Sequence, residues 1–555
     1  MKTKDRKSFI DISLPTETAD GYYMNKSKNE IENFIFIEPE WYKQLFHQNT
    51  FYILGPKGSG KTLYAAYMCA DIRNNTISKS HTIDVGDYGK LINMKIKNRL
   101  DFTAYLTMWK VVLLQKFLFG IDSKEIAIWG RNRSFNEIQN TISNYFGYDV
   151  TDDSFNPILV IDSYGKQAEV TNYLAEQFGG ELNIPPFQFS LVDDSKMEQK
   201  LINCMDNKIE KNSLVYTDTW MRAINEFQKT IKKISFRYNH FLFIDGLDVR
   251  PKEIDAREYS ECIGALVRAI YDINTKILGN MKRKDNYDFK IVALTRTDIF
   301  LNSELVNVTS CINDNCVELD WTYTNEKDFN YSNLYKMMNR LLGGDGVETT
   351  KEMPVEKYFD FKLPFPINRP ISASMYIQRL SRLRPRDIVV MLRIIQKECK
   401  KRKLDNPDFE VMNSSDLYSN YSNYYTDQIK SEMMFNYNTE TIKQIFELIK
   451  MVKNGSFSES DFKTIFEGYC KIYPSFSKVF PTYQDVLNMW YSLDMIGWME
   501  SYEYGRPRMH WHYREVKAID EDYKLPWEQI RRANNVIFTI HNGTSKNILG
   551  TARKK

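Results

Sequence analysis

Short apolar or β-branched runs alternate with longer segments of helical spacing over the first 342 residues of the chain. Runs of this kind are typical of parallel strands that are buried on both faces of a sheet. The pattern therefore predicts an α/β domain in which a parallel sheet is flanked by helices. The predicted strands are 51–54, 81–85, 240–248, 289–298 and 316–321, and the clearest helices are 100–119 and 218–234.

Changes in this pattern predict the domain organisation. Between about 120 and 212 it becomes irregular and is broken at Pro157 and Pro185–Pro186, which indicates a helical insertion. Beyond 342, a proline-rich loop leads into helices without intervening strands, including a tyrosine-rich helix at 417–437. We expect the last part of the chain to be partly mobile. The predicted parts are a leader (1–35), a nucleotide-binding domain (36–342), a helical lid domain (343–437), a winged-helix domain (438–520) and a tail (521–555).

The winged-helix prediction rests on the rhythm of elements between 438 and 520. A DNA-reading helix needs Arg, Lys, Asn or Gln side chains that reach bases and phosphates. The third helix has no Arg or Lys and contains two Asp, whereas the wing carries Arg506 and Arg508. We therefore favour a structural domain and keep DNA as an alternative partner. The helices are expected at 441–452, 459–472 and 483–494, and the wing strands at 498–502 and 509–513.

A glycine-rich motif, G-x-x-x-x-G-K-[ST], follows the first predicted strand and precedes a helix-like run at 63–68. The glycines allow backbone N–H groups to turn toward a phosphate, and the helix N-terminus adds partial positive charge. Lys61 would reach the β- and γ-phosphates, and Thr62 would hold Mg²⁺ through its hydroxyl. The sequence therefore predicts a P-loop nucleotide-binding domain. The motif comprises Gly55, Pro56, Lys57, Gly58, Ser59, Gly60, Lys61 and Thr62.

Two aspartates lie near the end of one later predicted strand, and a polar pair lies near the end of the next. Asp245 ends a buried run and would bind the Mg²⁺ shell, usually through water. Asp248 would polarise the attacking water or cap the next helix. Near the end of the following strand, Thr295 or Arg296 would sense the γ-phosphate. The alternative for Arg296 is that it lies exposed to solvent. The plainer alternative for Asp245 and Gly246 is a buried strand that ends in an Asp-Gly turn.

Two arginines flank a proline at the start of a predicted amphipathic helix that runs to about 402. Proline is favourable in the first turn of a helix, so Arg384-Pro385-Arg386 indicates a helix start. The alternative is that Arg384 or Arg386 reaches back over a bound nucleotide as a sensor in the lid. The sequence leaves both interpretations open.

Composition narrows the classes of protein only slightly. The 75 basic and 72 acidic residues give a formal net charge of +3, so nucleic-acid binding would need a local basic patch. The seven cysteines are scattered, and Cys311 and Cys316 lack the second pair of a zinc site. His510 and His512 alternate in a wing strand without a third ligand, and we interpret them as structural. We expect a cytoplasmic protein without a signal peptide or a membrane span.

The order of these motifs resembles two related groups of ATPases, the STAND signal-transduction ATPases and the Orc-like AAA+ ATPases. The chain looks closest to a bacterial P-loop ATPase group between them, over about 36–115, 215–400 and 438–515. Asp245-Gly246-Leu247-Asp248 is similar to the STAND Walker B element, and Thr295-Arg296 to its third strand. Gly246 departs from many AAA+ enzymes, which place the catalytic glutamate there. No Lys or Arg lies between Arg296 and Cys316, where the AAA+ pattern places an arginine finger.

The resemblance implies an ATP-dependent switch that binds ATP and Mg²⁺, hydrolyses ATP slowly and assembles into homo-oligomers. It also implies a protein effector in trans and, by analogy, a role in bacterial antiphage defence. The alternatives are an Orc-like ATPase that clamps DNA with its winged helix, and a protein that retains ATP without hydrolysing it. Arg384-Pro385-Arg386 lies where the STAND class has a Gly-x-Pro lid motif and where AAA+ enzymes carry a sensor arginine.

Overall fold

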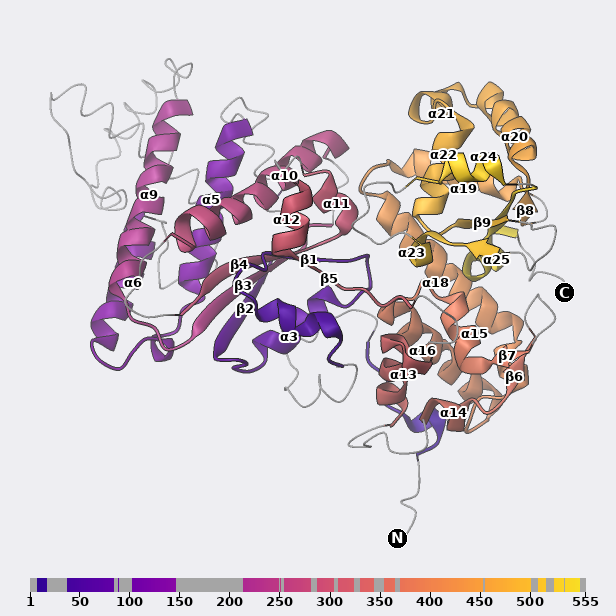
Figure 1. Ribbon diagram of the computed structural model, residues 1–555, viewed down its shortest axis with the longest axis horizontal. Helices are drawn as coiled ribbons and strands as arrows, with labels where there is room; N and C mark the ends of the chain where they lie inside the picture. Colours follow the sequence, from indigo (N-terminus) through magenta and orange to yellow (C-terminus); the bar gives the residue numbers. More distant parts are fainter. Residues whose placement is uncertain are drawn as a thin grey trace, which may run out of the picture. The chain divides into compact units, whose positions relative to one another are not determined.

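A five-stranded parallel sheet organises the first part of the structure, a computed structural model shown in Figure 1. Residue Leu54 pairs with Thr295, and Ile244 pairs with Ala293, so three strands end at the same edge of the sheet. This edge is where loops of α/β proteins gather their polar residues. In spatial order the strands are β2 (Thr76–Thr82), β3 (Asn239–Asp245), β4 (Phe289–Thr295), β1 (Tyr52–Leu54) and β5 (Cys316–Glu318).

The chain divides into two units, one formed by 44–54 and 68–317 and the other by 1–43, 55–67 and 318–555. Most of the predicted insertion (146–212) lies outside the described residues, as does Arg506. The structure describes residues 7–16, 37–83, 88, 102–145, 213–248, 250, 254–280, 287–303, 308–323, 330–343, 354–364, 370–452, 455–500, 508–515, 524–533 and 535–549.

Four of the five strands lie close to where the sequence predicts them, but β2 does not. It covers Thr76–Thr82 instead of 81–85. It begins after Asn74 and Asn75, whose positive φ angles of 46° and 56° make a tight turn. As the edge strand it is buried at Thr76 and Ser78 and more exposed beyond them, so it lacks the continuous apolar run of a central strand.

Helices of the first unit pack beside the sheet, with α10 (Ala256–Asp272) and the π-helical turn η6 (Ile273–Leu278) against β4. The nearly all-apolar α5 (Phe102–Phe119) packs against α10 and α9 (Ser213–Lys233), which explains its lack of a polar face. Its Lys110 pairs with Asp272 of α10 at 2.6 Å. The remaining helices are η2 (Glu40–Phe46, which begins in the second unit), η3 (Ser123–Glu125), α6 (Arg131–Tyr145), α11 (Thr297–Leu301) and α12 (Val308–Asn315).

The second unit contains the predicted lid helices. Among them, α16 (Pro385–Arg402) begins at the predicted proline and packs against α18 (Ser415–Met433). Near the N-terminus, η1 (Phe9–Asp11) also packs on α16, and Gln396 Nε2 donates hydrogen bonds to the carbonyls of Phe9 and Ile12. The other elements here are α3 (Lys61–Cys69, whose last two residues belong to the first unit), α13 (Asn333–Gly343), α14 (Pro354–Tyr358), β6 (Lys362–Leu363), β7 (Ile371–Ser372), α15 (Ala373–Leu380) and α17 (Phe409–Met412).

The three helices predicted for the C-terminal region are present, and α20 has the predicted bounds. The region also contains a four-stranded antiparallel sheet with the spatial order β10-β9-β11-β8. The elements are α19 (Thr439–Lys450), β8 (Ser456–Phe457), α20 (Glu459–Ile472), α21 (Pro474–Val479), α22 (Tyr483–Ser492), β9 (Ile496–Glu500), β10 (Arg508–His510), α23 (His512–Glu515), α24 (Trp527–Arg532), β11 (Ile537–Ile540) and α25 (Asn542–Leu549).

Two expectations about this region are wrong. The predicted tail contains β11, which pairs with both β8 and β9, and α25, which packs on α18. Residues 524–533 and 535–549 are therefore part of the fold, and their apolar strand β11 joins β8 to β9 in the sheet. The strand β10, which corresponds to the second predicted wing strand, ends at His510, and His512 begins α23, so these two histidines do not alternate along one strand. His510 stacks on Trp498 at 3.9 Å.

None of the helices that the structure describes is both long and apolar enough to cross a membrane.

Candidate functional site

The glycine-rich loop (Gly55–Thr62) leaves the end of β1 and runs into α3. Gly58 and Gly60 have φ angles of +86° and +100°, while Ser59 between them has a negative φ. Backbone that alternates in handedness turns successive N–H groups to one side, which is the geometry of an anion-binding nest. Lys61 Nζ donates hydrogen bonds to the carbonyls of Gly55 and Pro56, at 2.8 and 3.1 Å. The loop therefore has the backbone and the cation that fit a phosphate group.

A buried aromatic cluster lies behind the loop. Trp321 Nε1 donates to the carbonyl of Ser59 at 2.7 Å, and both groups are buried. Trp41 packs edge-on against Trp321 and Tyr64, and its Nε1 donates to the carbonyl of Asp320 at 3.4 Å. The sequence assigned no role to Trp41 or Trp321. The one sequence signal for Trp321 was its position as the last residue of a predicted strand.

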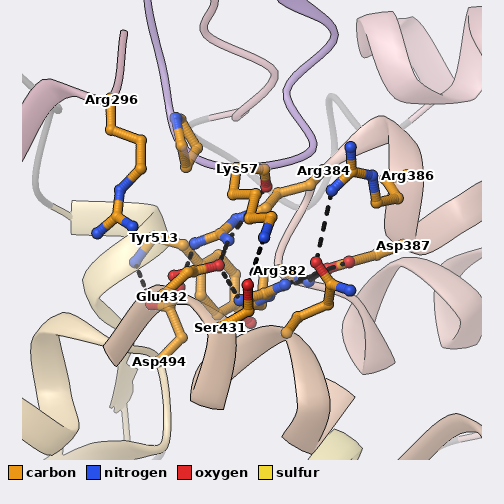
Figure 2. Close-up of polar contacts among 12 residues, drawn as sticks. Lys57, Arg296, Arg382, Arg384, Arg386, Asp387, Ser431, Glu432, Asp494 and Tyr513 are labelled. Carbon is orange, nitrogen blue, oxygen red and sulfur yellow. Dashed lines mark hydrogen bonds and ion pairs between the residues drawn. The ribbon is translucent and has the colours of Figure 1, made fainter. Parts of the chain in front are cut away.

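The start of α16 contacts the backbone of the loop (Figure 2). The backbone N–H of Arg386 donates to the carbonyl of Gly58 at 3.2 Å, and Arg384 Nη1 donates to the carbonyl of Lys57 at 3.3 Å. Lys57 Nζ in turn donates to Ser431 Oγ of α18 at 2.5 Å. The sequence left open whether these arginines only start a helix or also reach over a nucleotide. The structure shows the helix start and the contact with the loop, and the sensor role stays a prediction.

A buried ion-pair cluster surrounds Arg384 (Figure 2). Arg384 pairs with Glu432 at 2.7 Å and with Asp494 at 3.1 Å. Arg382 pairs with Glu432 at 2.9 Å and with Asp387 at 3.2 Å. All five side chains are at most 7% exposed, so water screens these charges weakly. Arg384 therefore links the loop, α18 and the end of α22.

Opposing charge keeps the buried carboxylate of Asp387 ionised. Burial alone would raise its pKa, but the charges of Arg382 and Arg384 and the hydrogen bonds from Arg382 hold the pKa below its ordinary value. Tyr424 also donates its hydroxyl to Asp387 Oδ1 at 2.8 Å. The cluster favours one arrangement of these side chains, because removal of any one of them leaves a buried polar group without its hydrogen-bond partner.

Asp494 connects several elements of the C-terminal region. It has a positive φ of 57° just after α22, and its side chain is 1% exposed. Its carboxylate accepts hydrogen bonds from Arg384 Nη2 and from the backbone N–H of Tyr513, and its carbonyl accepts one from the Tyr425 hydroxyl. The sequence treated this aspartate only as evidence against a DNA-reading helix.

His541 lies in the apolar layer beneath this cluster. Its ring stacks on Tyr425 at 5.0 Å, and its Nδ1 accepts a hydrogen bond from the backbone N–H of Gly543 at 3.0 Å. Burial lowers the pKa of His541 to about 3. The imidazole is therefore neutral, which its acceptor role at Nδ1 requires.

Asp245 and Gly246 form a tight turn at the edge of the parallel sheet. Asp245 Oδ1 accepts a hydrogen bond from the Gly246 N–H at 2.8 Å. Gly246 has a φ of +88°, and a Cβ there would lie 2.3 Å from the carbonyl oxygen of Ile83. The position therefore excludes any side chain, which gives a physical reason for the departure from a glutamate.

The two other predicted catalytic residues have distinct surroundings. Arg296 is 6% exposed and forms two hydrogen bonds with Asp298, at 2.5 and 2.9 Å. The alternative that Arg296 lies exposed to solvent is therefore wrong. Asp248 precedes α10, but Asp255 caps that helix by accepting the N–H of Arg257, so the capping alternative for Asp248 is also wrong.

No protein-family model matches the chain. No curated protein and no solved structure matches it either. The case for a function therefore rests on the residues and on their geometry.

Proposed function

We propose that the chain is an ATP-binding and slowly hydrolysing switch that forms homo-oligomers and controls a protein effector. The observation that carries the proposal is the position of Arg384. This one side chain donates to a loop carbonyl and pairs with carboxylates of α18 and of the residue after α22. A change at the loop would therefore alter contacts of both the lid helices and the C-terminal region.

The loop supplies the proposed nucleotide-binding groups. The N–H groups of Gly55–Thr62 and the N-terminus of α3 would hold the phosphates of ATP, and Lys61 would neutralise their charge. Thr62 and Asp245 are the residues proposed to hold Mg²⁺, which would polarise the γ-phosphate when bound. Support for Asp245 comes from the sheet register, since β3 and β1 end at the same edge.

Slow hydrolysis follows from the groups at the edge of the sheet. Gly246 offers no carboxylate, so Asp248 is the proposed group that orients the attacking water. Arg296 is held by Asp298, and its proposed contact with the γ-phosphate requires this pair to loosen. A switch benefits from slow turnover, because the ATP-bound state then lasts long enough to act on a partner.

The test combines turnover with assembly for the wild type, Lys61→Ala and Asp245→Ala. We expect slow release of phosphate by the wild type, and no release by either variant above the background without enzyme. Light scattering should show a defined oligomer with ATP and Mg²⁺ for the wild type, and a smaller species with ADP. An oligomer that forms only with a DNA duplex would favour the DNA-clamp alternative. Equal turnover by the wild type and Lys61→Ala would refute the proposal.

A further inference from the structure

The Ser59–Gly60 peptide of the glycine-rich loop is only weakly restrained by its own sequence, because a glycine follows it. Gly60 has a φ of +100°, and glycine adopts positive and negative φ about equally readily. Rotation of this peptide plane between the two φ regions would exchange the positions of the Ser59 carbonyl and the Gly60 N–H. A phosphate attracts the N–H and is repelled by the carbonyl oxygen, so the orientation of this peptide decides whether the loop can bind it.

One side chain fixes this orientation. Trp321 Nε1 donates a 2.7 Å hydrogen bond to the Ser59 carbonyl. The peptide is trans, so its N–H points away from its C=O. The bond therefore directs the Gly60 N–H to the side of the loop opposite Trp321. Loss of the bond would leave a buried carbonyl without this partner and would lower the barrier to rotation.

The indole is itself held in place from several sides. Trp321 is 4% exposed, and Trp41 packs edge-on against it at 6.1 Å. The Trp41 indole donates to the carbonyl of Asp320, the residue before Trp321. Leu319 is buried, and its Cβ lies 3.4 Å from the position that a Cβ on Gly55 would occupy. The segment 319–321 thus forms a rigid support for the loop.

We propose that Trp321 is a positioning residue for phosphate binding, which it supports by holding the Ser59–Gly60 peptide with its N–H available to a bound phosphate. The inference rests on the proposed function, in which the loop holds the phosphates of a nucleotide. It goes beyond that function because it assigns part of the phosphate affinity to a residue more than 250 positions away in the sequence.

The test uses Trp321→Phe, which keeps an aromatic ring but removes the N–H donor. Trp41→Phe is the matched control, because it removes an indole donor from the same cluster without touching the loop. The ligands are MgADP and inorganic pyrophosphate, and affinity is measured by calorimetry. A buried hydrogen bond of this kind corresponds to about a tenfold loss of affinity, equal for both ligands, in Trp321→Phe. We expect Trp41→Phe to stay within about twofold of the wild type.

A second pair of variants separates the hydrogen bond from ring packing and replaces Trp321→Phe if that variant does not fold. Trp321→Gln keeps a side-chain N–H donor and Trp321→Leu does not, so Trp321→Gln should bind pyrophosphate more tightly. Equal affinities in this pair, or equal losses in Trp321→Phe and Trp41→Phe, would overturn the inference and leave the proposed function standing. Failure of the wild type to bind either ligand would overturn both.

Discussion

The buried pair between Arg384 and Asp494 makes the sharpest stability prediction. The cluster around it contains two guanidinium groups, Arg382 and Arg384, and three carboxylates, Asp387, Glu432 and Asp494. Arg384→Met leaves one cation against three buried carboxylates and should cost about 3–5 kcal/mol of local stability. Asp494→Asn leaves two cations against two carboxylates and keeps an acceptor for the Tyr513 N–H, so it should cost only about 1–2 kcal/mol.

The double variant tests whether the two residues act as a pair. In Arg384→Met/Asp494→Asn one cation faces two carboxylates, so the cluster has the same net charge as in the wild type and lacks the extra unpaired carboxylate that Arg384→Met alone leaves. We therefore expect the double variant to lose about 2 kcal/mol less than the sum of the single losses. Hydrogen exchange of the amides in α16 and α22 measures these local free energies in the full chain.

A surface pair provides the control. Lys430 and Asp427 lie at 3.2 Å, with side chains 42% and 69% exposed. Solvent screens them, so Lys430→Met and Asp427→Asn should couple by no more than about 0.5 kcal/mol. Single losses at Arg384 and Asp494 that add within about 0.5 kcal/mol would refute the claim that the loop, α18 and the C-terminal region share one charge cluster.

Three further predictions concern other parts of the fold. The unfolded chain binds one proton more than the folded chain between the unfolded pKa of His541, near 6.5, and its folded value of about 3. Stability should therefore fall below pH 6.5, by about 2 kcal/mol at pH 5, and urea titrations should show a smaller loss in His541→Asn. Gly246→Ala should lower the urea midpoint by an amount equivalent to at least about 2 kcal/mol, and an unchanged midpoint would contradict the contact with Ile83. Gln396→Leu should make residues 9–12 cleavable by protease several-fold faster, since two hydrogen bonds worth about 1 kcal/mol each are lost.

Local sequence pattern predicted much of the fold. The runs that became β1, β3 and β4 are buried on both faces, so they read as continuous apolar segments. In the sequence, Pro385 marked the start of α16. The structure shows a capping box of Ser458 and Asp461 at the start of α20, a local signal on which the prediction did not draw. The predictions were wrong for elements that form only by pairing with a segment distant in the sequence. β11 looks like part of a loose tail until its pairing with β8 and β9 is known.

In the candidate site too, local signals could be predicted from the sequence, whereas contacts between distant residues could not. The spacing of the glycines and Lys61 is a local signal, and so is Asp245 after an apolar strand. The partners of Arg384 lie 48 and 110 residues away, and the hydrogen bond from Trp321 to Ser59 spans 262 residues. No periodicity encodes such contacts, because they depend on how separate elements pack.

The most direct test of the central claim is a calorimetric titration of the full chain with ATP and Mg²⁺, beside the same titration of Lys61→Ala. The account predicts saturable binding at one site per chain by the wild type, and at least about a hundredfold weaker binding by the variant, because a phosphate contact by a buried cation is lost. Equal affinity in the two proteins, or no binding by the wild type, would contradict it.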